Sequence, residues 1–342
     1  AWDGLDVCVD DLVEATAVST EIRHGAATPA RVPLGGRPVR LVHRRAFDRR
    51  LIEAAMQAGV DVHEREAALA IGEGSGITVT ASGGVYRGAA ILIGTGAEGS
   101  LGEPLGLRTP SRVRAVGLEI DAPARADGLD PCSLIFDYNL PGGYAWAFPK
   151  GDRWNVGVLS VRRAVAPQLR ARLAQFITEL GIRFELPGDP TRFARGRRIP
   201  FHEPGARLSR GRAALIGDAA GLPDPLFAEG IAQAIWSGQA AADSTLSLLG
   251  AGSDALAGYE TSLDALMGKH MRRMRWLARA VYARPALAVA ALRMPPHRWV
   301  ARRVSTEGFA GDPALRPSGS TSADRRSHLR RPARAALQDR TP

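Results

Sequence analysis

The chain has 342 residues, of which 45% are hydrophobic and 23% are charged. This composition provides material for one large or two smaller cores, and it excludes a chain disordered throughout, a collagen and a disulfide scaffold. Two cysteines, Cys8 and Cys132, are too few for a cysteine-based metal site. They indicate a reducing compartment.

The net charge of +10 is distributed unevenly. Residues 269–342 carry 17 basic and 4 acidic side chains, which leaves 28 basic and 31 acidic ones in residues 1–268. No nucleic-acid recognition motif accompanies the basic end, so we predict no nucleic-acid partner. Arginines interleaved with Trp276, Tyr282 and Trp299 suit an anionic membrane surface. A solvated helix face with an arginine bias is the alternative, and both interpretations stay open.

The two ends of the sequence carry no targeting signal. The chain begins at Ala1, and residues 1–11 lack the basic and apolar regions of a signal peptide. We therefore predict a cytoplasmic protein. A peripheral position at the inner face of the cell membrane is the alternative within this prediction. Because the opening residues are typical of the middle of a domain, we also predict that N-terminal sequence precedes them in the whole protein.

Hydrophobic periodicity and Gly/Pro punctuation predict the elements of the first half. In chain order they are a strand at Val39–Val42, a helix at Ala46–Ala58, a strand at Val60–His63, a hairpin of Gly76–Ala81 and Val85–Arg87, and a strand buried on both faces at Ala89–Ile93.

The second half begins with a strand-rich block and ends in helices. The predicted elements are strands at Val113–Asp121, Cys132–Asp137, Gly143–Phe148 and Trp154–Val161, a helix at Pro167–Leu180, a strand at Ala213–Ile216, and helices at Glu229–Leu249 and Ser253–Ala283. Residues 311–342 are rich in Pro, Ser, Gly and Arg, which predicts a disordered tail.

The strongest motif lies in residues 212–242. A buried strand ends in the small residues 217–221 around Asp218, and Gly230-Ile231 then open a small-residue helix. Small residues let backbone N–H groups approach a ligand closely. A carboxylate at a strand end can accept hydrogen bonds from sugar or ribityl hydroxyls, and a helix N-terminus favours an electron-rich group.

This segment resembles the second flavin-binding motif of the FAD-dependent reductase and hydroxylase superfamily. That motif reads G-D-A-A, then P, then G-E-G-I before a small-residue helix. The resemblance implies that Asp218 binds the ribityl or pyrophosphate region and that Gly230-Ile231 lie near the pyrimidine edge of the isoalloxazine. A generic strand–turn–helix unit is the plainer alternative, but about twenty positions match in order.

Two weaker matches point to the same superfamily. Residues 44–51 resemble its R-x-x-F-D-x-x-L helix start, which implies that Arg44 reaches the cofactor; a solvated arginine is the alternative. Residues 93–96 resemble the strand end beside the dinucleotide, with Thr95 in place of the commoner Asp. The candidate cofactor residues are Arg44, Thr95, Gly96, Gly217, Asp218, Ala219, Gly221, Pro225, Gly230 and Ile231.

Residues 94–99 satisfy G-x-G-x-x-G literally. A dinucleotide fingerprint also needs a helix opening on those glycines, whereas Gly102 and Pro104 disfavour one here. The superfamily's initial βαβ unit is absent, so we expect this chain to bind FAD weakly or not at all. Cys8 lacks the Gly-Gly neighbours of the family's flavin-side cysteine and is predicted to be a small core residue.

The aromatics of Tyr144-x-Trp146-x-Phe148-Pro149 alternate, so all three face one side of a strand. Such a wall suits a flat or polyisoprenoid ligand, although a core strand is the alternative. The pattern resembles the Y-x-W-x-F-P motif of the geranylgeranyl reductase family, which lines its substrate cavity. The resemblance implies substrate contacts for Tyr144, Trp146, Phe148 and Pro149.

The resemblance implies an α/β fold: an incomplete Rossmann-like FAD-binding domain of the glutathione-reductase type, with an inserted mixed or antiparallel β-sheet substrate domain and C-terminal helices. We assign residues 1–110 and 196–250 to the FAD-binding domain and 111–195 to the substrate domain. Residues 251–310 are then the C-terminal helices, and 311–342 the tail.

The implied activity is FAD-dependent reduction of carbon–carbon double bonds in a prenyl chain on a lipid, quinone or prenyl diphosphate. NAD(P)H or another external reductant would supply the electrons. The residues identify no proton donor, and the scattered histidines predict no metal site. An FAD-dependent aromatic monooxygenase is the alternative within flavoenzymes, and a truncated lipid-binding remnant without catalysis is the alternative outside them.

Overall fold

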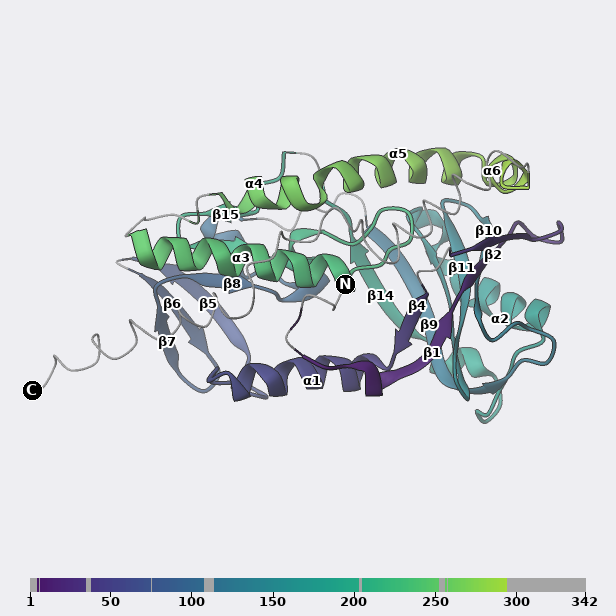
Figure 1. Cartoon of the computed structure of the whole chain (residues 1–342), viewed down its shortest axis with the longest axis horizontal. Coiled ribbons are helices and arrows are strands. Elements are labelled where there is room, and N and C mark those ends of the chain that lie inside the picture. Colours follow the sequence, from purple (N-terminus) through teal and green to yellow (C-terminus); the bar gives the residue numbers. More distant parts are fainter. Residues whose placement is uncertain are drawn as a thin grey trace, which may run out of the picture.

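A computed structural model describes residues 5, 7–34, 38–74, 76–107, 114–202, 205–251, 256 and 258–293. Its larger sheet and a small two-stranded sheet form one half of the molecule, and two three-stranded sheets lie in the other half (Figure 1). The predicted α/β class is confirmed. The predicted disordered tail at 311–342 lies outside the described residues.

The larger sheet contains eight strands, in the order β13-β9-β12-β11-β10-β2-β3, with β14 also paired to β9. The strands are β2 (Ser19–Arg23), β3 (Ala30–Pro33), β9 (Arg114–Arg125), β10 (Ser133–Leu140), β11 (Gly143–Lys150), β12 (Arg153–Ser160), β13 (Arg183–Phe184) and β14 (Arg195–Pro200). The four strands predicted for this block are β9 to β12. Because β2 pairs with β10 in parallel, the sheet has both parallel and antiparallel neighbours. The same pairing adds residues from near the N-terminus to the sheet.

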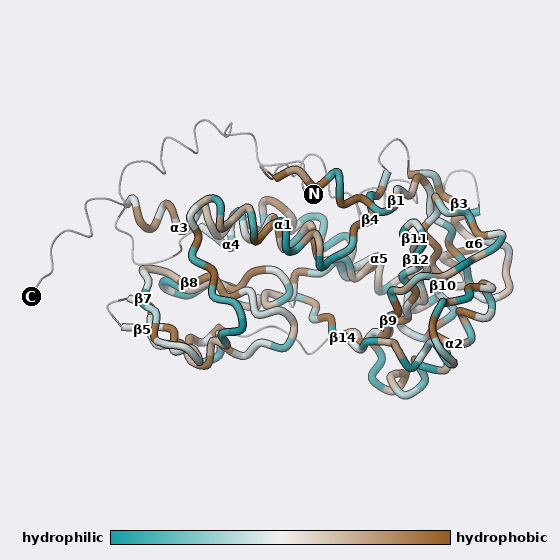
Figure 2. The backbone as a smooth tube through the Cα atoms, turned by 90° about the horizontal axis from the view of Figure 1, so that it is seen from below, coloured by the Kyte–Doolittle hydropathy of each residue, from teal (hydrophilic) through white to brown (hydrophobic). Residues whose placement is uncertain are grey.

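One face of this sheet is covered by α2 (Leu169–Leu180), which a 3-10 helix at Arg163–Gln168 precedes. Leu173 and Phe176 of α2 pack there with Val156 and Val158 of β12. A second 3-10 helix, Pro190–Phe193, leads from this region toward β14. In Figure 2 hydrophobic stretches lie along β9 and around β10.

Two of the three small sheets occupy the other half, and the two-stranded one lies beside β11 of the larger sheet. One pairs β8 (Ile91–Ile93) in parallel with β16 (Ala213–Leu215), which also pairs with β15 (Ser209–Arg210). The others join β5 (Ala68–Glu73), β6 (Ile77–Ala81) and β7 (Val85–Gly88), and β1 (Val13–Ala17) with β4 (Val39–Val42). The predicted hairpin and the predicted strand at 39–42 are confirmed.

The remaining helices are α1 (Arg44–Gln57), α3 (Ile231–Ala251), α4 (Tyr259–Leu263), α5 (Lys269–Ala283) and α6 (Pro285–Ala291), with 3-10 helices at Asp10–Leu12, Gly96–Glu98, Glu103–Leu105 and Gly217–Ala220. The single helix predicted for 253–283 is interrupted, because a π-helical turn at Asp264–Gly268 joins α4 to α5. Helix α5 extends from the small-sheet half over the larger sheet (Figure 1). Within the described part of the chain, no helix has the length and apolarity needed to cross a membrane.

Three local predictions are wrong. Residues 60–63 form no strand, and Val60 is 54% exposed, because none of the described strands pairs with this segment. Leu92 of β8 is 36% exposed, since β8 is the outer strand of its described sheet and one face stays partly open. Cys8 is exposed rather than a core residue.

Candidate cofactor and substrate site

The carboxyl ends of β8 and β16 lie side by side, because the two strands are parallel neighbours and Ile216 N donates to Ile93 O at 3.0 Å. The chain then turns at Gly217, whose φ is +56° and whose N–H donates to Ser237 Oγ of α3 at 3.0 Å. A side chain at Gly217 would come within 3.3 Å of Ala234. Glycine therefore lets the turn pack directly against α3.

Asp218 follows this turn and lies beside the start of α3. A Cβ atom on Gly230 would be 3.1 Å from Asp218 Oδ1, so the missing side chain keeps the two segments close. Burial raises the pKa of the Asp218 carboxyl, and the positive charge of Arg44 opposes that rise. A half-buried carboxylate without a strong cation partner has unused capacity to accept hydrogen bonds.

Arg44 begins α1, next to the same helix start. Phe47 of α1 belongs to a small apolar cluster against which Ile231 and Ile235 of α3 pack. The Arg44 guanidinium forms two hydrogen bonds with Asp48, at 3.1 and 3.2 Å, and is 61% exposed. The structure thus brings Arg44 into the electrostatic field of Asp218 while its side chain is paired along its own helix.

Thr95 and Gly96 complete the edge formed by the two strand ends. The 3-10 helix at Gly96–Glu98 contacts the one at Gly217–Ala220. A side chain on Gly99 would lie 1.8 Å from Thr95 Oγ1, so the threonine side chain packs back over this glycine. The G-x-G-x-x-G run itself forms only this short 3-10 turn, and another 3-10 turn at Glu103–Leu105 follows it, which confirms that these glycines do not open a dinucleotide-binding helix.

The polar groups here have the character of a ligand site. Gln233, in the first turn of α3, is 3% exposed, and its Oε1 has no hydrogen-bond partner among the described residues. The first N–H groups of any helix also lack intrahelical acceptors. Asp218 and Gln233 can accept hydrogen bonds from hydroxyl groups, and the N–H groups at the helix N-terminus favour an electron-rich edge. A flavin has both features, because its ribityl chain carries hydroxyls and its ring has an electron-rich edge.

The aromatic side chains predicted on one strand face do share it. Tyr144, Trp146 and Phe148 of β11 lie on the same face, and Phe136 of the neighbouring strand has its ring centroid 5.5 Å from Tyr144 and 5.3 Å from Phe148. Trp146 covers Gly157, where a Cβ atom would meet the indole at 2.2 Å. Tyr144 is buried, whereas Trp146 and Phe148 are half-buried, so part of this wall stays accessible.

A loop at residues 224–229 joins this aromatic wall to the start of α3. The Tyr144 hydroxyl donates to Phe227 O, and the Tyr282 hydroxyl of α5 donates to Leu226 O at 2.7 Å. Phe227 itself lies 5.7 Å from Phe136 between ring centroids. The loop before α3 therefore contacts the aromatic wall, although Tyr144 and Phe227 are 83 residues apart in sequence.

Asp224 holds this loop in place. Its Oδ1 accepts hydrogen bonds from Leu226 N at 2.8 Å and Phe227 N at 2.9 Å, and its Oδ2 lies 2.9 Å from His270 Nε2 of α5. Sequence reasoning missed Asp224, Glu229 and His270. The Asp-Pro pair at 224–225 is a turn signal, but nothing in the sequence indicates that His270 packs against it.

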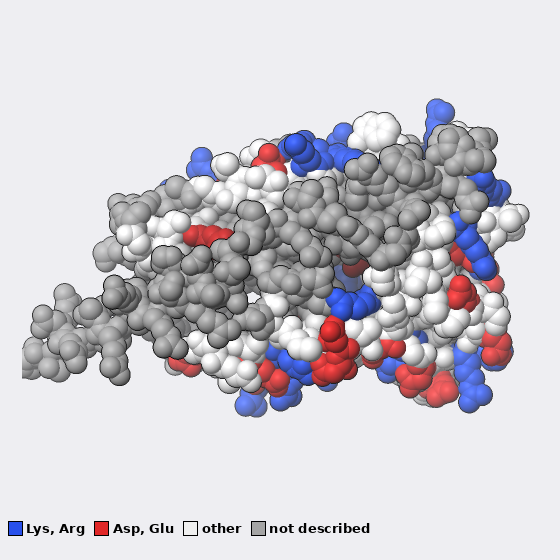
Figure 3. Space-filling view, in the orientation of Figure 1, with Lys and Arg blue, Asp and Glu red and all other residues white. Residues whose placement is uncertain are grey.

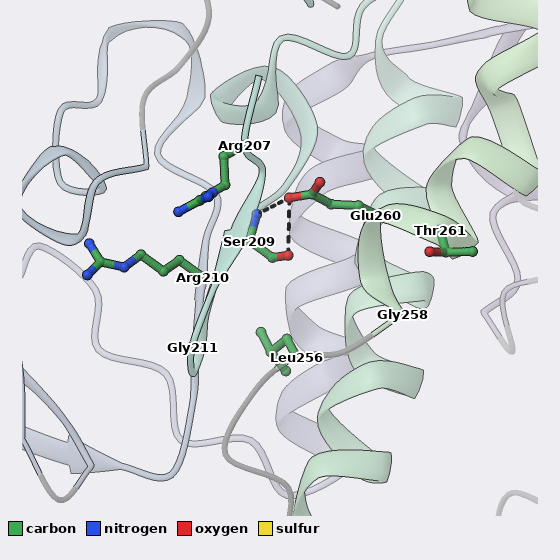
Figure 4. A pocket seen from close by; sticks show the side chains of 8 residues that line it. All are labelled: Arg207, Ser209, Arg210, Gly211, Leu256, Gly258, Glu260 and Thr261. Atoms are coloured by element: carbon green, nitrogen blue, oxygen red, sulfur yellow. Dashed lines mark hydrogen bonds between the residues drawn. The ribbon is translucent and has the colours of Figure 1, made fainter. Parts of the chain in front are cut away.

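A separate hollow lies between β15 and α4, away from all of these residues (Figure 4). Glu260 Oε1 accepts hydrogen bonds there from Ser209 N at 2.8 Å and Ser209 Oγ at 3.2 Å. Arg210 Nη1 donates to Leu105 O at 3.0 Å. These polar groups tie β15 to its neighbours, and none of the predicted site residues lines the hollow.

No protein-family model matches the chain. Digeranylgeranylglycerophospholipid reductase 1 of Methanopyrus kandleri is 29% identical over 213 residues, which cover 59% of this chain and 56% of that protein. The digeranylgeranylglycerophospholipid reductase of Methanocella arvoryzae is 28% identical over 249 residues, covering 68% and 61%. The chain thus spans between 56% and 61% of these curated relatives.

Among solved structures, a geranylgeranyl bacteriochlorophyll reductase-like protein from Thermoplasma acidophilum has the same fold. It superimposes with a TM-score of 0.68 at 21% identity, covering 80% of this chain and 72% of that one. The chain is thus similar in sequence to digeranylgeranylglycerophospholipid reductases, and it shares the fold of the geranylgeranyl bacteriochlorophyll reductase-like protein.

Proposed function

We propose that this chain reduces carbon–carbon double bonds of geranylgeranyl-type prenyl chains on a lipid, with FAD as its cofactor. The observation that carries the proposal is the Tyr144–Phe227 hydrogen bond, which joins the aromatic wall to the loop before α3. The aromatic hydroxylase alternative has less support, because the curated relatives are named as reductases of a prenyl lipid.

In this proposal the cofactor lies along the carboxyl ends of β8 and β16 and over the N-terminus of α3. Asp218 and Gln233 would accept hydrogen bonds from its hydroxyls, and Gly230 and Ile231 would face the ring. At the remaining motif residues the backbone would lie close to the cofactor. These residues are Thr95, Gly96, Gly217, Ala219, Gly221 and Pro225. Arg44 would exchange part of its pairing with Asp48 for the bound cofactor. We also keep the predicted domain boundaries in this proposal, with the change that β2 and β3, which pair in the larger sheet, go with the substrate domain.

The bound FAD, when reduced, supplies the hydride. An isolated alkene offers no carbonyl for the protein to polarise, so orientation and exclusion of water must provide much of the rate enhancement. Trp146 and Phe148 present half-buried rings on which an isoprenoid chain can lie. Tyr144 anchors that wall through its buried hydroxyl. The electron donor to the flavin, NAD(P)H or another reductant, is part of the same proposal.

The test is anaerobic turnover of the chain. Because weak FAD binding is expected of this chain, the protein is given FAD in excess, reduced with dithionite and mixed with digeranylgeranyl glycerophospholipid, and the extracted lipid is analysed by mass spectrometry. Stepwise gain of two hydrogens with flavin reoxidation supports the proposal. Asp218→Asn should weaken FAD binding, measured by quenching of flavin fluorescence, whereas Asp243→Asn on the exposed side of α3 should not. Unchanged lipid, or hydroxylation of an added aromatic in a parallel reaction supplied with oxygen, refutes it.

We further propose that α5 docks this enzyme on an anionic membrane. Lys269, Arg272, Trp276 and Arg279 are exposed along one stripe of the helix, opposite the buried Met271 and Met274. Trp276 is 68% exposed, which suits an interfacial aromatic anchor. Figure 3 shows basic side chains along the upper edge of the molecule, where α5 runs in Figure 1.

Vesicle sedimentation tests this docking. Basic residues near anionic headgroups contribute about 1 kcal/mol each, although Arg272 is already paired with Asp264 at 2.6 Å. Replacing Lys269 and Arg279 with Gln should therefore lower binding to phosphatidylglycerol-containing vesicles by at least roughly tenfold. Trp276→Ala should weaken it too, while Phe193→Ala, an exposed aromatic outside α5, serves as control. Equal binding to pure phosphatidylcholine vesicles contradicts the docking.

A further inference from the structure

The Trp146 indole extends sideways over the neighbouring strands of the larger sheet. The register of β11 and β12 places Trp146 directly opposite Gly157. A Cβ atom on Gly157 would overlap the six-membered ring of the indole, and one on Gly117 of β9 would lie 3.9 Å from its Cη2 atom. The ring therefore crosses β12 and reaches β9, and glycine at both positions leaves the space that it occupies.

Two hydrogen bonds fix the ring in this direction. Trp146 Nε1 donates to Asn155 Oδ1 of β12 at 2.6 Å, and Asn155 Nδ2 donates to Glu119 Oε2 of β9 at 3.2 Å. An indole only donates and a carboxylate only accepts, so the Asn155 amide satisfies both partners in one orientation alone. The three side chains thus link β11, β12 and β9 through hydrogen bonds, and the indole cannot rotate without breaking this link.

The charged side chains beside these hydrogen bonds are paired with one another. Asp121 lies opposite Asn155 in the register of β9 and β12. Its Oδ2 accepts from Lys150 Nζ at 2.8 Å, and its Oδ1 accepts from Arg153 Nε at 3.1 Å. These groups are engaged along the sheet, and the acceptor for the indole N–H is the Asn155 amide.

The hydrogen bond to Asn155 also withdraws the polar group of Trp146 from the aromatic wall. An indole has a single N–H donor, and the amide takes it within the sheet. Trp146 is half-buried and lies 6.0 Å from Tyr144 and 6.4 Å from Phe148 between ring centroids. The Tyr144 hydroxyl is likewise used, by Phe227 O. The wall therefore presents hydrocarbon at a fixed angle, whereas an N–H group without an acceptor there would attract water.

We infer that Asn155 is a positioning residue for the prenyl substrate, an inference that rests on the proposed function. By holding the indole over β12, Asn155 keeps Trp146 ordered before the prenyl chain arrives and keeps the indole N–H away from that chain. Glu119 fixes the Asn155 amide in turn. The prenyl chain then meets a rigid apolar surface, and its binding does not have to order the ring.

The first readout needs neither FAD nor turnover. In each background, the emission of Trp146 is obtained as the difference between the protein with and without Trp146→Phe. Asn155→Ala should shift this emission to longer wavelength and increase its quenching by acrylamide, because the freed ring turns toward water. Asn155→Asp combined with Glu119→Gln keeps an acceptor for the indole and a donor behind it, so this pair should restore the parent emission. Asn139→Ala, at an exposed asparagine of β10, is the control. An unchanged Trp146 emission in Asn155→Ala overturns the inference.

The second readout is calorimetric titration of the FAD-free protein with digeranylgeranyl glycerophospholipid in detergent micelles. Asn155→Ala should raise the Kd by about two- to tenfold, because a free side chain must be ordered again on binding. The same substitution made in Trp146→Phe should leave the Kd of that variant unchanged, since no indole remains to be held. An equal loss of affinity in both backgrounds overturns the inference, as does no loss in either, or a parent protein that binds no lipid. Failure of the parent protein to reduce the lipid, with the affinities as expected, refutes the proposed function instead.

Discussion

Replacement of Asp224 by Ala is the most informative test of how the loop before α3 is held. Asp224 is fully buried, and its two carboxylate oxygens serve the N–H groups of Leu226 and Phe227 and the His270 imidazole. Alanine removes all three acceptors at once. The loop carries Phe227 into the aromatic wall and Glu229 to the helix start, so its stability matters to both parts of the site.

The expected loss follows from these three contacts. A buried donor left without an acceptor costs about 1–3 kcal/mol of the free energy of unfolding. Because the loop can relax, we expect the three lost contacts together to lower that free energy by about 3–5 kcal/mol, less than the full sum. Asp224→Asn keeps an oxygen that can accept from the two backbone amides, so its free energy of unfolding should fall by only about 1–2 kcal/mol.

Urea unfolding followed by circular dichroism measures both variants against the parent chain. The midpoint should fall while the slope stays constant, which shows that stability rather than the unfolded state has changed. A double-mutant cycle with His270→Gln then isolates the coupling across the 2.9 Å contact. A loss below about 1 kcal/mol for Asp224→Ala would refute the view that this carboxylate anchors the loop.

Three further predictions concern the same region. Ala228 stands where the family motif has its first glycine and has a φ of +55°; Ala228→Gly should raise the free energy of unfolding by about 0.5–1 kcal/mol, and a decrease in the urea midpoint would contradict this. Gly157→Ala should cost about 1–3 kcal/mol and shift the fluorescence of Trp146, because the new methyl group would meet the indole; an unchanged emission spectrum would show that the ring lies elsewhere. Since burial raises the folded-state pKa of Glu229 from 4.5 to about 7, its contribution to stability is complete below pH 4.5 and is lost as pH rises through 7; the loss is roughly 3 kcal/mol, and Glu229→Gln should flatten this part of the pH–stability curve.

Several elements could be predicted from the sequence because local patterns decide them. Strands β9 to β12 follow from alternation bounded by Gly and Pro turns, and α1 from one apolar face that ends before Gly59. The strand–turn–helix unit around Asp218 is likewise local, since its glycines and small residues are adjacent in sequence. Each of these features depends on residues within one or two turns of the chain.

The pairing of β2 and β3 with the larger sheet could not be predicted in this way. Ser19–Arg23 carries too few apolar residues to mark a strand, and it is stabilised by parallel hydrogen bonding to β10, more than 100 residues later by the register of the two strands. The same limit explains residues 60–63, whose alternation indicates a strand although the described part of the chain offers no strand that pairs with them. A strand needs a neighbour, and only the tertiary structure supplies one.

The sequence by itself determined the family motifs, the α/β class and the face shared by Tyr144, Trp146 and Phe148. Tertiary structure alone decided that this face meets the loop before α3, because a tyrosine hydroxyl and a buried aspartate join segments that are far apart along the chain. It also decided the environment of Glu229. A carboxyl group's proton affinity depends on burial and on charges from other elements, and no local pattern records them.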